Sequence, residues 1–137
     1  MKSVKFYAGE ALRWVCESIS DAGEKVYAMH RPTAKGTQMN DMIVVSFASE
    51  LADQGSFQNG TLRIDLISRD KGDGISNVKR LQEMCDAVVS KFPLVKGKFK
   101  AVSPKLIVKG SDGEGFSVWV VYASIQVNTS ERLEYGG

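Results

Sequence analysis

Residues 116–127, with the sequence FSVWVVYASIQV, form the segment that most constrains how this chain can fold. β-Branched and aromatic residues predominate in it, which favours a strand. Successive side chains of a strand point to opposite faces of a sheet, and here both sets of positions are largely apolar. Such a strand needs cover on both sides. We therefore expect a central strand, or one that packs on helices on one side and on a partner subunit on the other.

Two amphipathic helices are expected to supply part of this cover. Apolar residues recur at helical spacing over residues 8–21 and again over residues 76–91. We expect Gly23 to end the first helix in the left-handed conformation, which costs glycine little. Ser76 is the predicted N-cap of the second helix, and Pro93 is expected to end it.

Shorter runs of strand-forming residues complete the predicted sheet, at residues 26–29, 42–48, 61–68 and 105–109. Residues 31–41 show no period and predict a loop, and the polar, glycine-containing residues 49–60 indicate a wide hairpin connection. The expected fold class is α+β, in the order α-β-β-β-α-β-β. The sheet should be mainly antiparallel, with two helices packed on one face.

The length of the chain suits one domain. Of its 137 residues we assign 1–128 to a single α+β domain and 129–137 to a flexible C-terminal tail. The 18 basic residues nearly balance the 16 acidic ones, which argues against a dedicated nucleic-acid binder. The sequence has no apolar stretch of transmembrane length and no apolar signal-peptide core near its start. We therefore expect the protein to be cytoplasmic when it is made.

Catalytic, cofactor-binding and metal-binding sites are not predicted. His30 is the only histidine and no G-x-S-x-G elbow accompanies it, so an edge or surface position is expected. Cys16 and Cys85 lie in apolar-periodic segments, which favours free structural thiols over a disulfide or a reactive thiol. Residues 70–74 and 111–115 lack the ligand spacing of a calcium loop and are typical of turns. We expect no enzyme and no cofactor.

A block of lysines is the main charge asymmetry of the chain. Residues 87–111 contain no acid and six lysines: Lys91, Lys96, Lys98, Lys100, Lys105 and Lys109. The block could be a solvated loop with an edge strand protected by lysine, or a docking surface for an acidic partner that also tolerates DNA passing nearby. Phe57, near the expected tip of the 49–60 connection, could be a partner contact or a packing residue. The candidate partner surface comprises Phe57, Lys96, Lys98, Lys100 and Lys105.

The layout as a whole resembles the small tail terminator, or tail-completion, proteins of long-tailed bacteriophages, which are often encoded in prophages. The matching pattern is an N-terminal helix, a Val26-Tyr27 strand, a Pro-containing loop, the apolar strand 42–47, the alternating strand 62–66 with its acid, a helix with a continuous apolar stripe, and two strands joined by an Asp112-Gly113 turn and ending at Gln126-Val127-Asn128. It covers about residues 8–128. The longer 49–60 segment and the lysine block depart from the family pattern.

The resemblance implies a structural virion protein without a catalytic residue. Family members form a ring, usually a hexamer, that caps the tail tube, stops its polymerisation and joins it to the head connector. The implied partners are other copies of the chain, the tail-tube protein and head–tail connector proteins. DNA would only pass through the lumen, without specific binding, and no membrane is involved. The implied location is the bacterial cytoplasm during assembly and then the virion tail.

Two alternatives remain open at this point. The chain could be another head–tail joining protein, from the neck or the completed head, because such proteins share its size and class. It could also be a small ligand-binding domain or enzyme, which would need a concave pocket with converging polar groups. If the lysine block docks a partner, charge reversal of Lys98 and Lys100 should weaken docking and leave the fold intact.

Overall fold

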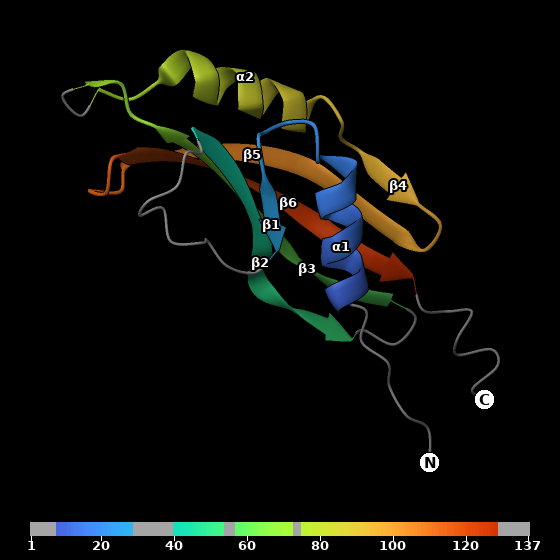
Figure 1. The fold of residues 1–137 in the computed structure, drawn as a ribbon. Helices are drawn as coiled ribbons and strands as arrows, with labels where there is room; N and C mark the ends of the chain where they lie inside the picture. The colour runs from blue at the N-terminus through green and yellow to red at the C-terminus, as the bar shows by residue number, and fades with distance from the viewer. Residues whose placement is uncertain (1–7, 29–39, 54–56, 73–74, 129–137) are drawn as a thin grey trace, which may run out of the picture.

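The computed structural model describes residues 8–28, 40–53, 57–72 and 75–128, with only the backbone described for residues 50–53 and 57. The elements are α1 (Ala8–Ser18), β1 (Val26–Ala28), β2 (Asp41–Asp53), β3 (Phe57–Arg69), α2 (Val78–Val89), β4 (Leu94–Lys96), β5 (Phe99–Ser111) and β6 (Phe116–Asn128) (Figure 1). The predicted α+β class and element order are confirmed, and β4 adds one short strand to the order. Neither described helix has the length and apolar character needed to cross a membrane.

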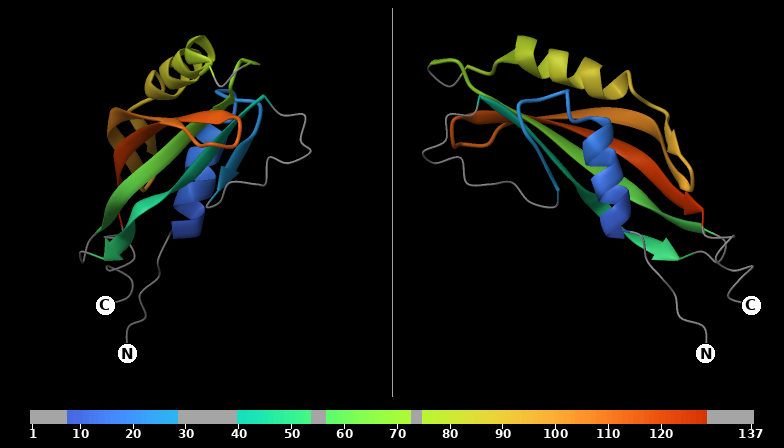
Figure 2. Two further views of the ribbon diagram at one scale, coloured as in Figure 1. Left: turned by 90° about the vertical axis from the view of Figure 1, so that its left-hand side faces the viewer. Right: turned by 45° about the vertical axis from the view of Figure 1, so that its right-hand side comes forward.

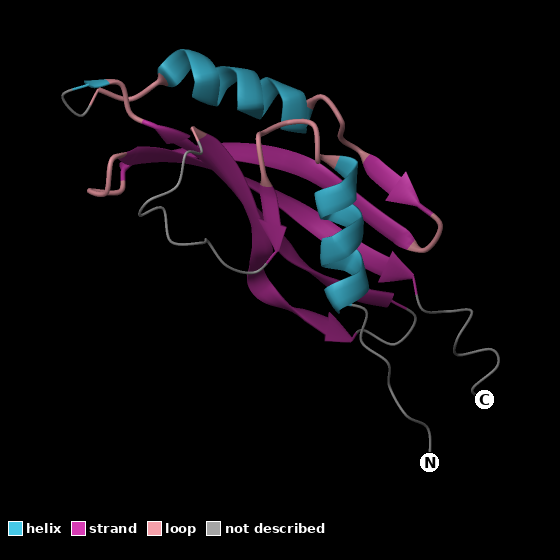
Figure 3. Ribbon diagram, in the orientation of Figure 1, coloured by secondary structure: helices cyan, strands magenta, loops and turns pink. Residues whose placement is uncertain are grey.

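The six strands form one curved sheet in the order β1-β2-β3-β6-β5-β4 (Figure 3). All neighbours are antiparallel except β1 and β2, which are parallel. Strand β6 pairs with β3 over its whole length, from Phe116 opposite Arg69 to Asn128 opposite Phe57. Its other edge pairs with β5. The prediction of a central strand at residues 116–127 is therefore confirmed.

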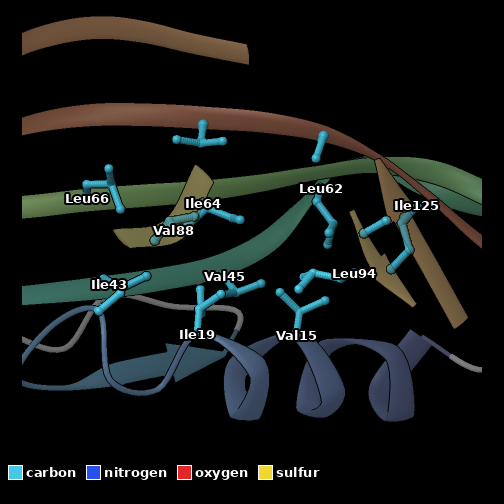
Figure 4. Close-up of a cluster of buried hydrophobic side chains, with 14 of the residues drawn as sticks. Val15, Ile19, Ile43, Val45, Leu62, Ile64, Leu66, Val88, Leu94 and Ile125 are labelled. Carbon is cyan, nitrogen blue, oxygen red and sulfur yellow. The ribbon is translucent and has the colours of Figure 1, made fainter. Parts of the chain in front are cut away.

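The main core lies between the sheet and the two helices, which pack on the same face. Val15 and the following Ile19 point from the α1 segment toward the strands, and Val88 reaches the same cluster from α2 (Figure 4). Both tryptophans, Trp14 and Trp119, belong to this core. Figure 2 shows how the sheet curls, with α2 lying along it. Removal of these apolar side chains from water is the main driving force for this arrangement.

A smaller apolar cluster occupies the opposite face of the sheet. It consists of Met42, Val44, Ile67 and Phe116, with Tyr27 and Val118 packed against it. The guanidinium carbon of Arg69 lies 4.8 Å from the centre of the Phe116 ring. This cluster explains why the first half of β6 is apolar on both faces. Farther along β6, Ser124, Gln126 and Asn128 are exposed on that face, so the second half has one wet face.

The first helix ends earlier than predicted, and Gly23 has a different role. The helix stops at Ser18, and Gly23 does not adopt the left-handed conformation that was expected of it. A β-carbon on Gly23 would lie 3.1 Å from both the Asp41 Oδ1 atom and the Ile43 Cγ1 atom. A larger residue at this position would need β2 to shift slightly, so the role of Gly23 is to allow the close approach of β2. The predicted loop at 31–41 and His30 fall mainly outside the described residues.

The wide connection predicted at residues 49–60 is wrong. Strand β2 continues to Asp53 and β3 already begins at Phe57, so only residues 54–56 join them. Backbone pairing persists through this polar stretch, for example between Ala52 and Asn59. The register shifts on both sides of Ser49. Such bulges break the two-residue alternation by which a strand is recognised in a sequence.

Two other predicted boundaries also differ from the structure. The N-cap of α2 is Asn77, whose side chain accepts a hydrogen bond from the Arg80 backbone N–H at 3.2 Å, so the prediction of Ser76 was wrong. The strand predicted at 105–109 is the second half of β5, which begins at Phe99. Ser103 has a φ of +59°, and the register shifts between Val102 and Lys105. Because the bulge interrupts the alternation of side chains, the sequence pattern did not predict the first half of this strand.

Candidate functional site

Two of the six lysines form ion pairs with α1 and the turn that follows it. Lys91 comes just after α2, and Lys98 lies between β4 and β5. Lys91 Nζ lies 2.9 Å from an Asp21 carboxylate oxygen. Lys98 Nζ lies 3.7 Å from a Glu10 carboxylate oxygen and 5.5 Å from the centre of the Phe99 ring. These lysines therefore have structural partners within the chain. The Lys91 contact lowers the pKa of Asp21, chiefly through its hydrogen bond and then through its charge.

The β4–β5 hairpin carries Lys96 and Lys98 beside an aromatic pair. Its turn contains Gly97, whose φ of +58° is one that glycine adopts at little cost. The Phe99 ring stacks on the Trp14 ring with 5.3 Å between centroids. These five residues line a shallow hollow of about 390 Å³. The hairpin thus presents two ammonium groups next to a partly apolar surface on the helix-covered face of the sheet.

Lys100 lies on the opposite face of the sheet, where it lines a polar hollow. The volume of the hollow is about 520 Å³. Its lining residues are Ser49, Asn59, Gly60, Thr61, Lys100, Val102, Ser124, Ile125 and Gln126. Hydroxyl, amide and ammonium groups in this set can donate and accept hydrogen bonds. The arrangement suits contact with the polar surface of a partner.

Lys105 and Lys109 lie farther along β5. Lys105 pairs with Tyr122 of β6, one position before the exposed apolar residues Leu106, Ile107 and Val108. Lys109 lies in the second bulge, between Val108 and Gly110. Both lysines are exposed. The lysine block is therefore distributed along the hairpin and β5, and it reaches both faces of the sheet.

Phe57 is separated from the lysine hairpin by β6. It is the first residue of β3 and pairs with Asn128. Its side chain lies outside the described part of the structure, so the expected partner contact remains a prediction. The five predicted residues thus occupy three places: the hairpin, the polar hollow with the adjoining β5 edge, and the start of β3.

Sequence reasoning did not single out the ion pair that fixes α2 to β2. The Asp41 carboxylate is buried and accepts hydrogen bonds from the Arg80 Nε atom at 2.8 Å and the Glu24 backbone N–H at 2.6 Å. The hydrogen bond to Asp41, followed by the charge of Asp41, raises the pKa of Arg80. Asp41 lies at a strand start with no sequence motif, so only the tertiary structure could identify its partner.

A second polar chain links the segment before α2 to β6 and the loop after β3. The Ser117 hydroxyl donates to an Asp70 carboxylate oxygen at 2.6 Å, and the Ser76 and Ser117 hydroxyl oxygens are 2.7 Å apart. Ser117 is completely buried. This hydrogen-bonded set of side chains includes no imidazole or thiol that could activate a hydroxyl. Its role is to hold three segments together. Among the described residues, no group of three or more histidines, cysteines or carboxylates is arranged to hold a metal ion.

The two cysteines are free, as predicted. Cys85 is buried in the core and Cys16 is partly buried beside it. Burial raises the pKa of both thiols, and the negative charges of Glu17 near Cys16 and of Asp86 near Cys85 add to the effect. A raised pKa keeps a thiol protonated and unreactive. Their environment is that of packing residues.

Comparisons with known proteins give a structural likeness only. No family model matches the chain, and no curated protein matches it either. One solved chain, from the virion of a native gene transfer agent particle, superposes with a TM-score of 0.52 and 12% sequence identity. The likeness covers 90% of this chain and 99% of that chain. A second solved chain, with 10% identity over 89% of this chain and 90% of its own, has a TM-score of 0.49, which is too low for a conclusion. The chain therefore shares its fold with a component of the gene transfer agent virion.

Proposed function

We propose that this protein is a structural component of a phage-type virion, and specifically a tail terminator. In this role it forms a ring, expected to be a hexamer, that caps the tail tube, stops its polymerisation and joins it to the head connector. The observation that carries the proposal is the fold likeness to a gene transfer agent virion chain over nearly the full length of both chains. The family resemblance of residues 8–128 points to the same kind of particle.

The surfaces of the domain support a role in assembly. The lysine hairpin, the polar hollow and the exposed edge of β5 lie in different parts of one molecule. A ring subunit needs two different patches for its neighbours and further surface for the tube and the connector. The proposed partners are other copies of this chain, the tail-tube protein and the connector. DNA passes through the lumen without specific contacts.

The test is polymerisation of the tail-tube protein encoded with this chain. Tube length and tube ends are measured by electron microscopy with and without the purified protein. We expect shorter tubes with a ring at one end. Tubes of unchanged length without additional density at their ends would overturn the terminator proposal.

Lys100 offers a sharper probe of docking than Lys98. Lys98 contacts Glu10 and Phe99, so its reversal to glutamate would also disturb the hairpin. Lys100 lines the polar hollow on the other face. If the lysine block docks an acidic partner, Lys100→Glu should reduce tube capping, and its unfolding midpoint should match that of the wild-type protein. Equal capping by both proteins at low salt would exclude this use of Lys100.

A neck or head-completion protein is the second candidate, because the likeness to a virion chain supports it equally. Cryo-electron microscopy of assembled particles distinguishes the two. Density for this chain at the last tube ring supports the terminator, and density on the head side of the joint supports the alternative.

A further inference from the structure

Among the described residues, the sheet has an uncovered edge along the second half of β5. Strand β4 pairs only with Phe99–Ala101, and β6 occupies the other side of β5 throughout. From Lys105 to Ser111, no strand of the described chain therefore pairs with the outer edge of β5. Backbone N–H and C=O groups at alternate residues of such an edge remain available to another strand.

The side chains on this edge are unusual for a surface exposed to water. Leu106, Ile107 and Val108 follow one another and are 37%, 42% and 58% exposed. Single exposed apolar residues are common, but a run of them on a free edge favours pairing with another chain. Leu106 lies opposite Val121 and so shares the helix-covered face, whereas Ile107 lies opposite Val120 on the other face. A partner strand would cover side chains on both faces.

On the other side of the same sheet, the second half of β2 also has an outer edge with no strand partner among the described residues. Strand β1 pairs only with Ile43–Val45, so from Ser46 to Asp53 the described chain pairs with β2 only through β3. The sequence of this half of β2 contains Glu50 and Asp53 and no basic residue, whereas the second half of β5 contains Lys105 and Lys109 and no acid. The sequences of the two edges therefore have opposite net charge.

We propose that the outer half of β5 pairs with the outer half of β2 from a second copy of this chain. The inference rests on the proposed function, since it names the surfaces by which the ring closes. Because β2–β3, β3–β6 and β6–β5 are all antiparallel, β5 runs opposite to β2. A copy related by rotation about a ring axis would therefore present its β2 antiparallel to β5.

A contact between these two halves can generate a closed ring. The contact uses two different edges, so it is heterologous, and heterologous contacts generate rings when the rotation closes. Across the sheet, Val108 of β5 lies level with Ile43 of β2, because the register runs from Val108 to Trp119, Leu66 and Ile43 in turn. Ile43 belongs to the half of β2 that β1 covers. The uncovered halves are thus displaced along the strand direction. Tilted strands in a closed barrel have this kind of stagger from one strand to the next.

The test reverses the charges of one edge and then of both. Sedimentation at low salt measures self-association of the wild-type protein, of Lys105→Glu/Lys109→Glu, and of the same variant with Glu50→Lys and Asp53→Lys added. We expect association of the wild-type protein to be at least about tenfold tighter than that of the double variant. The fourfold variant should recover this association, because the two edges again carry charges of opposite sign. Added salt should weaken association in both associating proteins.

The matched control is Lys71→Glu/Lys79→Glu, which has the same change of net charge at two exposed positions outside both edges. It should associate as the wild-type protein does, and circular dichroism should show all variants folded. Three results would each overturn edge pairing. The double variant could associate as tightly as the wild-type protein, or the fourfold variant could fail to recover association. The wild-type protein could also stay monomeric at every concentration and on tube ends.

Tube capping separates this inference from the proposed function. If the double variant caps tubes as well as the wild-type protein does, edge pairing fails and the terminator role stands. If the charge swap restores association but the oligomer leaves tube length unchanged, edge pairing stands and the terminator role fails.

Discussion

At the scale of single residues, Ser117 shows how a buried hydroxyl can join three segments. A serine has one hydroxyl hydrogen, and that of Ser117 goes to Asp70. In the bond between Ser76 and Ser117, Ser76 must therefore be the donor. Ser117 is completely buried, so the loss of these bonds cannot be compensated by water without a change in structure.

Replacement of Ser117 with alanine is expected to lower the free energy of unfolding by about 1–2 kcal/mol. The variant removes the group that accepts from Ser76 and donates to Asp70. Ser76→Ala, the control, removes only one of the two bonds and should cost less. Urea unfolding of both variants measures the difference, and an equal effect of the two substitutions would mean that the bond from Ser117 to Asp70 adds nothing to stability.

The thiols should respond to pH in a defined direction. Because burial raises their pKa in the folded protein, Cys16 and Cys85 should be alkylated more slowly than a free cysteine near neutral pH, with the rate rising as pH increases. Cys85, only 5% exposed, should be the slower of the two. Above the ordinary thiol pKa the unfolded chain loses these protons first, so stability should fall as pH rises. Mass spectrometry of the alkylated protein gives both rates, and faster labelling of Cys85 would contradict the burial argument.

At the scale of elements, α2 is held by contacts at its beginning as well as by its apolar face. Asn77 caps the helix by accepting from the Arg80 N–H, and the side chain of the same arginine binds Asp41 of β2. Leu81, Met84, Cys85 and Val88 are buried against the sheet. The first turn of α2 thus determines where the helix lies relative to β2, and the buried stripe determines which side faces the core.

Loss of the cap should destabilise the protein moderately. Asn77→Ala removes the acceptor for the Arg80 N–H and should cost about 1 kcal/mol. Asn77→Asp keeps an acceptor and places a negative charge at the helix N-terminus, so it should be at least as stable as the wild-type protein. Thermal or urea unfolding compares the three. Equal stability of the alanine and aspartate variants would mean that the cap contributes nothing.

At the scale of the whole molecule, the curl of the sheet brings the two ends of the domain together. Trp14 of α1 stacks on Phe99 at the start of β5, and the Glu10–Lys98 contact lies beside this pair. Trp14 is 7% exposed and belongs to the core that both helices share. The segments before β1 and after α2 therefore complete one core, and we expect them to unfold together.

Truncation of Trp14 should test this closure. Trp14→Ala is expected to cost about 3–5 kcal/mol, because it removes a large buried side chain and its stacking partner for Phe99. Trp14→Phe keeps an aromatic ring and should recover a large part of the loss. Urea unfolding followed by circular dichroism provides the measurement. A loss below about 1 kcal/mol for the alanine variant would show that α1 is only loosely joined to the hairpin.

The sequence predicted interior regularity better than boundaries or sites. The stripe of the first helix and the alternation of Leu62, Ile64 and Leu66 follow simple periods, and the structure confirms them. The stripe predicted for the second helix is confirmed except at its first residue, Val78, which is 54% exposed. Bulges near Ser49 and Ser103 interrupt the period, so the sequence pattern missed half of two strands. The pairing of Arg80 with Asp41 depends on where α2 crosses the sheet, which no local pattern specifies.

What the sequence determined by itself was the local character of each segment: which residues form helices and strands, and that residues 116–127 form a central strand. These properties depend on periodicity and propensity, which act over a few neighbouring residues. Only the tertiary structure decided that the lysine block divides between two faces of the sheet. It also decided that the first half of β5 pairs with β4, whereas its second half has no strand on its outer edge in the described part of the chain. The physical reason is that strand neighbours and free edges are set by pairing between segments far apart in the chain, where a shift of one register position changes which side chains reach which face.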